Sequence, residues 1–380
     1  MWIGAGEALN RFDGKEFRTF TPKSKNSINA PENDINCLLT DQSNCIWIGT
    51  TVDLLAYDIK NNQFKGARFE GNQEPVYVRC LFEDARSNIW AGTSSGIYRL
   101  KNRENLIFEK TGTYDNTGLR PGIHSQIIRS IFCDNDNTLW AGTNAGLVKI
   151  RFTQTDTTYT HFKHDPQNPA SISSNTVSSI TADKYNNLWV GTQSQGINLL
   201  DKATGTFTRI HTGSPKLSLL NNFVRVIKPD TTGNIWVGTQ EGLTQINWRQ
   251  QTAVSYRNDP LNKHSLSQNS VHSLFTDQNN LVWVGTFFGG INLINPFPSE
   301  FQTWQNNGLS SGLSNNVVSS ITSDLKGNLW IGTEGGGVNY YNKPTKNFTY
   351  YKQGPQSVGS NLIKTILKDR DGNIWVGTHA

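Results

Sequence analysis

The sequence predicts an all-β fold, a β-propeller made of four-stranded blades. One short motif recurs along the whole chain of 380 residues: a tryptophan, a small or β-branched residue, glycine, and then threonine or alanine. Its tryptophans are Trp2, Trp47, Trp90, Trp140, Trp189, Trp236, Trp283, Trp330 and Trp375. Neighbouring copies lie 43 to 50 residues apart, a spacing typical of propeller arrays, in which one small sheet cannot bury its faces alone. No segment shows the 3.6-residue apolar periodicity of a helix over three turns.

The four strands of a blade are clearest between residues 316 and 351. Residues 318–321 are β-branched or small and predict the first strand, and a turn over 324–328 follows, in which Gly327 can take a positive φ. Residues 329–333 predict the second strand, 337–341 the third and 348–351 the fourth. Four short strands without intervening helical periodicity describe a propeller blade.

Several residues recur at fixed places in the repeat, and we expect them to hold the blade together. An aspartate stands six residues before the motif tryptophan, at Asp41, Asp84, Asp134, Asp183, Asp230, Asp277, Asp324 and Asp369. Its carboxylate can accept hydrogen bonds from the backbone N–H groups of the following turn. A catalytic carboxylate would not be needed eight times, so we interpret these residues as structural. An asparagine precedes the first strand at Asn33, Asn175, Asn222, Asn269, Asn316 and Asn361, whereas Val76 and Gln126 break that pattern.

The number of blades depends on how the ring is divided. A seven-bladed propeller over residues 1–329 would leave 330–380 as the start of a second propeller or a closing blade, and this is our prediction. The alternative is a single ring of eight blades, which would be shown by pairing of the strand at 363–369 with Trp2–Ala5. Because Met1 stands directly before a motif tryptophan, we expect the chain to be a fragment whose first blade lacks its inner strand.

Composition and cysteine content exclude several classes of function. The net charge is +5 and charged residues make up 17% of the chain, without the Lys/Arg block that follows a phosphate backbone, so we expect no nucleic-acid binding. No apolar run approaches the roughly 18 residues that span a bilayer, and no basic-then-apolar segment precedes Trp2. Cys37, Cys45, Cys80 and Cys133 are expected to be free thiols. No CxxC pair indicates zinc, and we expect neither a metal nor a cofactor.

The repeat resembles a known family. The run around 175–192 and again 316–333, Asn-x-Val-x-Ser-Ile-x-x-Asp followed by Asn-Leu-Trp-x-Gly-Thr, looks like the two-component regulator propeller repeat. The likeness covers nearly the whole chain. This family forms the periplasmic sensor region of hybrid two-component systems in polysaccharide-degrading Gram-negative bacteria. There, two seven-bladed propellers precede an immunoglobulin-like domain, a membrane helix, a histidine kinase, a receiver and a DNA-binding domain, whereas this sequence shows the propeller repeats only.

The resemblance implies a function for the chain. We expect a non-catalytic, periplasmic ligand-sensing propeller that recognises an oligosaccharide and signals to a histidine kinase in the full-length protein. The implied partners are the oligosaccharide, a second propeller and the downstream immunoglobulin-like domain of the same chain, and a second copy in a homodimer. Two alternatives remain open: a structural or protein-interaction propeller, and a glycan-active propeller enzyme. The enzyme is disfavoured because no Tyr/Glu pair or Ser/His/Asp set stands outside the repeat.

The candidate site follows from where the repeats differ. The loop entering the first strand and the turn after the second lie at the same end of every blade, so in a ring they surround one opening of the channel, which we call the mouth. The position five residues before each aspartate carries Arg79, Arg129, Arg225, His272 and Lys364 in five repeats, and guanidinium groups suit carboxylate, sulfate or hydroxyl oxygens. Pairing of each arginine with an acid such as Glu83 is the alternative. Phe287 and Phe288 replace polar residues in a mouth turn, where an exposed aromatic pair needs a cover, either a sugar ring or a neighbouring domain.

A second stretch, which contains two histidines, resembles a metal site only superficially. His161 and His164 stand three residues apart, but His164 aligns with Asn258 ahead of the parallel turn Asp259-Pro260. We therefore predict an ordinary outer-loop position for His164. The predicted ligand-binding residues are thus Arg79, Arg129, Arg225, His272, Phe287, Phe288 and Lys364. Because a mouth residue faces the ligand, we expect Arg225 to play no part in blade packing.

Overall fold

The structure is a computed structural model that describes residues 1–6, 8–20, 33–72, 74–111, 126–152, 157–262, 264–296, 303–306, 308 and 312–379. The chain divides into two compact units, Met1–Pro296 and Phe297–Ala380. All regular elements in the described residues are β-strands, so the predicted all-β class is confirmed. None of them is a helix that could cross a membrane.

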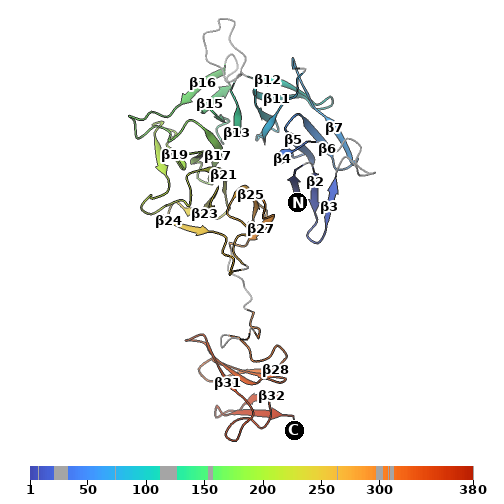
Figure 1. Cartoon of the computed structure of the whole chain (residues 1–380), viewed down its shortest axis with the longest axis vertical. Coiled ribbons are helices and arrows are strands. Elements are labelled where there is room, and N and C mark those ends of the chain that lie inside the picture. Colours follow the sequence, from blue (N-terminus) through green and yellow to red (C-terminus); the bar gives the residue numbers. More distant parts are fainter. Residues whose placement is uncertain are drawn as a thin grey trace. The chain divides into compact units, whose positions relative to one another are not determined.

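The first unit contains seven sheets, and Figure 1 shows them following one another around a ring. The first sheet is β1 (Trp2–Ala5), β2 (Ala8–Phe12) and β3 (Phe17–Phe20). The second is β4 (Ile35–Thr40), β5 (Cys45–Thr50), β6 (Leu54–Asp58) and β7 (Gln63–Gly66). The third is β9 (Val78–Glu83), β10 (Ile89–Thr93), β11 (Gly96–Asn102) and β12 (Ile107–Thr111), with β8 (Arg68–Phe69) parallel to β12. The fourth is β13 (Ile128–Cys133), β14 (Leu139–Thr143), β15 (Gly146–Phe152) and β16 (Thr157–Phe162).

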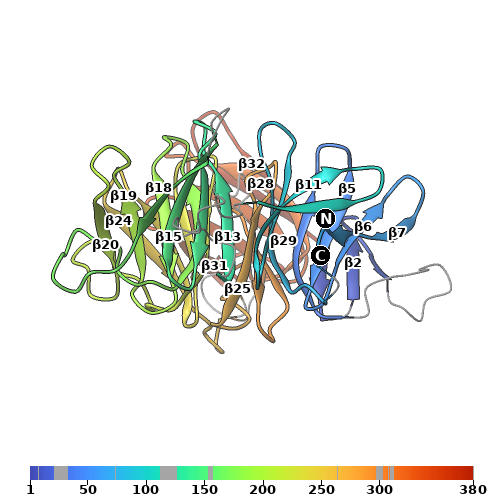
Figure 2. The same cartoon turned by 90° about the horizontal axis from the view of Figure 1, so that it is seen from above.

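The remaining sheets of this unit continue the pattern. The fifth is β17 (Val177–Ala182), β18 (Leu188–Thr192), β19 (Ile197–Leu200) and β20 (Phe207–Ile210). The sixth is β21 (Val224–Pro229), β22 (Ile235–Thr239), β23 (Gly242–Asn247) and β24 (Thr252–Tyr256). The seventh is β25 (Val271–Thr276), β26 (Val282–Thr286) and β27 (Ile291–Ile294). Neighbouring strands within a blade are antiparallel, and in Figure 2 the strands of this unit run between its two ends, where the loops lie.

The first and seventh blades are neighbours, which makes seven the blade number of the first unit. The rings of Phe12 in β2 and Trp283 in β26 have centroids 6.3 Å apart. The same kind of contact joins Trp47 to Phe108 of the next blade, at 5.5 Å. Within the described residues β1 pairs only with β2, so the blade of Trp2 has three strands.

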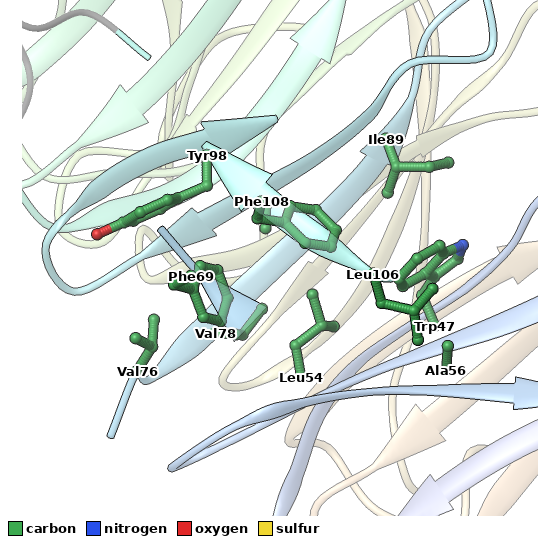
Figure 3. Packing of buried hydrophobic residues seen from close by; sticks show 11 residues of the cluster. Trp47, Leu54, Ala56, Phe69, Val76, Val78, Ile89, Tyr98, Leu106 and Phe108 are labelled. Carbon is green, nitrogen blue, oxygen red and sulfur yellow. The ribbon is translucent and has the colours of Figure 1, made fainter. Parts of the chain in front are cut away.

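The core lies between the blades, because each sheet buries its two faces against its neighbours. Trp47 is fully buried against Val78, Ile89 and Phe108 of the third blade, as Figure 3 shows. The glycine of the motif permits this approach: a Cβ on Gly49 would stand 2.7 Å from Cγ1 of Val78. Trp supplies a large apolar plate and Gly the room for the next inner strand, which is the structural role predicted for the motif.

The repeat aspartate holds the turn after the first strand, as predicted. Asp41 Oδ1 accepts hydrogen bonds from the backbone N–H groups of Ser43 and Cys45, both at 2.9 Å. Its Oδ2 accepts a further bond, from Nε1 of Trp47, at 2.8 Å. Although burial raises the pKa of Asp41, the hydrogen bonds from Trp47 and Cys45 outweigh it and leave this pKa below the usual value. One carboxylate therefore fixes both the turn and the buried tryptophan.

The repeat asparagine anchors the loop that enters the first strand. Asn175 Oδ1 accepts the backbone N–H of His164 at 2.8 Å, and Asn222 and Asn269 accept those of Thr212 and Asn258 in the same way. The asparagine amide thus closes the loop that lies ahead of the inner strand, and the same hydrogen bond recurs in these three loops of the mouth.

The second unit holds two further sheets of the same kind. One is β28 (Val318–Ser323), β29 (Leu329–Thr333), β30 (Gly337–Asn342) and β31 (Asn347–Tyr351), and the other is β32 (Ile363–Lys368) and β33 (Ile374–Thr378). These bounds confirm the four strands predicted between 316 and 351. The boundary between the units differs from the predicted 329/330. β28 pairs with β29 through the short turn at Asp324–Asn328, so it belongs to the second unit. β32 likewise pairs with β33.

The four cysteines are free thiols, as predicted. Cys37 and Cys80 occupy equivalent positions on the inner strands β4 and β9. Burial raises the pKa of the Cys80 thiol to about 12 and that of Cys37 well above its usual value. Such thiols behave as small apolar core residues.

Candidate ligand-binding site

The predicted site position is a β-bulge on the inner strand of every blade from the second onward. Val224 pairs with Thr239 and Val226 with Gly238, so Arg225 between them has no partner on β22. The same one-residue shift leaves Arg79, Arg129 and His272 unpaired across their own sheets. A bulge breaks the strand alternation and re-aims the side chain of the extra residue.

Where the bulge residue is small, its side chain reaches the next blade. Asn36 Nδ2 donates to the carbonyl of Val78 at 3.1 Å, and the Ser178 hydroxyl donates to the carbonyl of Val224 at 2.7 Å. Each acceptor is the first residue of the following inner strand. The bulge residues therefore lie around the start of the inner strands, on the channel side of the blades, and consecutive ones are neighbours.

Arg79 and Arg129 occupy this position in adjacent blades and have no acidic partner among the described residues. The guanidinium carbon of Arg79 lies 4.0 Å from the ring centroid of Tyr77. The Nε atoms of both arginines are buried without a hydrogen-bond partner in the described part of the chain. Burial, and then the like charge of Arg79, lowers the pKa of Arg129. Glu83, the acid named as an alternative partner, accepts instead the backbone N–H of Gln42 at 3.0 Å.

Arg225, His272, Phe287 and Phe288 form a second group, on the sixth and seventh blades. Arg225 Nη1 donates to the hydroxyl of Ser270, and the ring of His272 stacks on Phe287 with centroids 4.8 Å apart. Phe287 and Phe288 meet edge to face at 4.1 Å and are 54% and 82% exposed. Burial, and then the charge of Arg225, lowers the pKa of His272. Since Arg225 bonds to the next blade, the expectation that it plays no part in packing is wrong.

Lys364 belongs to the second unit of the chain, whereas the other six predicted residues belong to the first. It is the bulge residue of β32, in the second unit, and its Nζ makes an ion pair with Glu334 at 2.7 Å. The equivalence of its repeat position is correct, but its charge is already paired. Among the described residues no group of three or more His, Cys, Asp or Glu side chains could hold a metal ion.

A polar hollow that the sequence pattern did not indicate lies at the mouth end of the fifth blade. It measures about 650 Å³ and is lined by the strand-entry loop 173–176, the turn at Ser194 and Gln195, and His164, Pro166, Arg209 and His211. His164 does lie in the predicted outer loop, but its ring faces this hollow. The one signal in the sequence is a histidine where the parallel loop has Asn258.

These observations define a repeat β-propeller whose inner-strand bulges carry arginine at three positions and histidine at a fourth. A model of the two-component regulator propeller family matches residues 29–51, 122–145, 171–194, 218–241, 265–288, 312–335 and 357–380. The chain is therefore built of two-component regulator propeller repeats.

Solved structures with a similar fold include the following three proteins. The extracellular domain of a hybrid two component system from B. thetaiotaomicron is 28% identical over the whole chain, with a TM-score of 0.64, and this chain spans 48% of it. PorZ, a surface component of the type-IX secretion system of Porphyromonas gingivalis, is 16% identical over 92% of this chain and 57% of its own, with a TM-score of 0.62. Virginiamycin B lyase from Staphylococcus aureus is 14% identical over 77% and 89% of the two chains, with a TM-score of 0.55. The last two likenesses concern the fold alone. Comparison with curated proteins gives no significant match.

Proposed function

We propose that this chain is the periplasmic ligand-sensing region of a two-component sensor. In this proposal it binds an oligosaccharide at the mouth without catalysis and signals to a histidine kinase in the whole protein. The seven family repeats and the likeness to the extracellular domain of a hybrid two component system support the sensor role. A propeller suits this role because equivalent loops from many blades converge on one surface.

The observation that carries the ligand-binding part is the pair Arg79 and Arg129. A buried donor without a partner costs about 1–3 kcal/mol, and here two such Nε atoms belong to like-charged groups on adjacent blades. An anionic or strongly polar group bound in the channel would reduce the repulsion between the two guanidinium groups. Carboxylate, sulfate and hydroxyl oxygens of an oligosaccharide all have the required acceptor character.

The proposal is tested by binding of the whole chain to an array of neutral and acidic oligosaccharides, followed by calorimetry on each hit. The double variant Arg79→Ala/Arg129→Ala should weaken binding at least about tenfold, the loss expected from one charge-assisted hydrogen bond of ~1.5–3 kcal/mol. Lys364→Ala is the matched control, because it removes a cation from the same repeat position that is already paired with Glu334. Unchanged affinity in the double variant would place the oligosaccharide elsewhere.

A protein-interaction surface is a second candidate function, favoured by the exposure of Phe287 and Phe288 on the mouth turn. An aromatic pair of this kind is costly in water unless another domain or a second copy covers it. Sedimentation velocity of the chain and of Phe287→Ser/Phe288→Ser distinguishes this candidate from the first. Concentration-dependent association that the double variant abolishes would support the interaction surface, and a monomer in both would rule out self-association through it.

A further inference from the structure

The hollow on the fifth blade has a lining that is rich in hydrogen-bonding groups and free of acids. Ser173–Thr176 and Ser194-Gln195 contribute hydroxyl and amide groups at the mouth end of β17 and β18, and His164 and His211 come from the loops that follow β16 and β20. Figure 1 shows β16, β17 and β19 next to one another on the ring. A volume of about 650 Å³ lies within the range of small-molecule sites.

The orientation of the His164 ring is fixed by the loop. Its Nδ1 lies 2.9 Å from the carbonyl oxygen of Ile172, which can only accept, so Nδ1 carries a proton. In parallel loops the amide of Asn258 donates to the carbonyl of Leu266 at 2.6 Å, and that of Asn306 to Ser314 at 3.0 Å. His164 therefore makes the bond that asparagine makes elsewhere in the repeat, and has in addition a second nitrogen, Nε2.

His211 is held in the same tautomer. Its Nδ1 lies 2.6 Å from the carbonyl oxygen of Thr212, so this nitrogen also donates. In the neutral rings Nε2 is then an acceptor, and neither Nε2 is bonded to any described residue. Two imidazoles of one hollow thus offer acceptor nitrogens whose direction is set by the backbone.

Arg209 provides the positive charge of the hollow. Its Nε donates to the carbonyl of Ser171 at 3.0 Å, and its Nη2 donates to the carbonyl of Asn168 and the hydroxyl of Ser171. These bonds fix the plane of the guanidinium, and Nη1 has no partner among the described residues. Asp165, the acid next to His164 in sequence, is not part of the lining, and its Oδ1 accepts the N–H of Gln167.

We propose that this hollow binds a sugar acid, a polyhydroxylated ring that carries a carboxylate. The carboxylate would accept from Arg209 Nη1, while ring hydroxyls donate to the Nε2 atoms of His164 and His211 and exchange bonds with the serine and amide groups. A lining of acceptors, donors and one cation, without any carboxylate, matches such a ligand in both hydrogen bonding and charge. Neither Arg79 nor Arg129 lines the hollow, so the proposal does not rest on oligosaccharide binding at those two arginines.

His164→Asn is the decisive variant, because the repeat itself shows that asparagine keeps the loop bond at this position. The whole chain is titrated with D-glucuronate and D-galacturonate at pH 7.5, with D-glucose and D-galactose as uncharged counterparts, and binding is followed by calorimetry and ligand-observed NMR. We expect at least one uronate to bind about tenfold more tightly than its neutral counterpart, and His164→Asn to weaken that binding by a further factor of about ten. Arg79→Ala/Arg129→Ala should leave it unchanged.

The same titrations can overturn the proposal. Equal affinity for a uronate and its neutral counterpart would contradict a contact between Arg209 and the carboxylate. Wild-type affinity in His164→Asn would contradict binding of the uronate in the hollow. Absence of any uronate binding would reject the site altogether. Loss of uronate binding in the Arg79→Ala/Arg129→Ala variant, with His164→Asn unaffected, would assign the sugar acid to the channel arginines instead.

Discussion

Replacing Asp230 by alanine should be among the most destabilising single changes in the first unit. Asp230 Oδ1 accepts the backbone N–H groups of Thr232, Gly233 and Asn234 at 2.9–3.0 Å. Its Oδ2 accepts Nε1 of Trp236 at 3.1 Å, and Trp236 is fully buried. The variant would leave the indole N–H buried without a partner, at about 1–3 kcal/mol, and would remove charge-assisted bonds across the turn. We expect a total loss of roughly 3–5 kcal/mol in the free energy of unfolding.

The measurement is urea unfolding of the whole chain, followed by tryptophan fluorescence and far-UV circular dichroism. A double-mutant cycle with Trp236→Phe isolates the indole bond, whose coupling energy should be about 1–3 kcal/mol. The second unit supplies the control: Nε1 of Trp330 is buried without a partner among the described residues, so the cycle of Asp324→Ala with Trp330→Phe should give almost no coupling.

Two results would refute this reasoning. One is a loss below about 1 kcal/mol in Asp230→Ala, which is the size of an ordinary surface change. The other is equal coupling in the two cycles. Ligand affinity of the folded variant should stay near that of the wild type, because Asp230 follows the end of β21 and Arg225 lies at its start.

Three further predictions concern stability and reactivity. Burial alone would raise the pKa of Asp134, but hydrogen bonds from Trp140 and Lys202 outweigh it and lower this pKa. The contribution of Asp134 to the free energy of unfolding is therefore complete above about pH 4 and is lost as the pH falls through the folded-state pKa. Unfolding free energies that stay constant from pH 5 to pH 3 would contradict this. Leu39 is partly buried and packs against the core, whereas Phe275 at the same repeat position is 53% exposed. Leu39→Ser should cost about 2–3 kcal/mol, and Phe275→Ser should cost less than about 1 kcal/mol and reduce light scattering. Cys80 should react with a thiol reagent at pH 8 only after urea is added, because burial raises its pKa.

Most of the blade could be predicted from the sequence because its signals are local. The strand at Leu329–Thr333 was predicted to the residue, since glycine-containing turns bound it on both sides. The aspartate turn was predictable for the same reason. The bond from the aspartate to the tryptophan was not predicted, although the constant six-residue spacing contained that information. The indole N–H of the motif tryptophan is bonded to the aspartate six residues earlier in seven of these eight repeats, the exception being Trp330.

The unit boundary could not be placed in the same way. The prediction assigned residues 318–323 to the first ring, where they would complete the three-stranded blade of Trp2. In the structure this segment pairs with β29, from which only five residues separate it. A local hairpin loses far less chain entropy than pairing across 300 residues of chain, so the segment stays with its sequence neighbour.

The candidate site shows what repeat alignment can and cannot supply. Alignment identified the bulge position, because every blade has the same backbone there. It could not say what each side chain does. Asn36 and Ser178 bond to the next blade, Arg225 does so through Ser270, and Nε of Arg79 has no hydrogen-bond partner among the described residues. These outcomes depend on side-chain length and on the residue opposite, which belongs to another repeat.

The same reasoning explains why repeat alignment does not indicate the hollow on the fifth blade. His164 aligns with Asn258, and the two residues are equivalent in the bond that both make to a loop carbonyl. Histidine, however, has a second ring nitrogen, and asparagine has nothing in that place. In a repeat protein the shared bond preserves the loop, so a residue that keeps the bond and adds a group can acquire a function without a cost in stability. In other blades, binding sites should therefore be sought at positions where a residue keeps the loop hydrogen bond of the repeat and adds a further polar group.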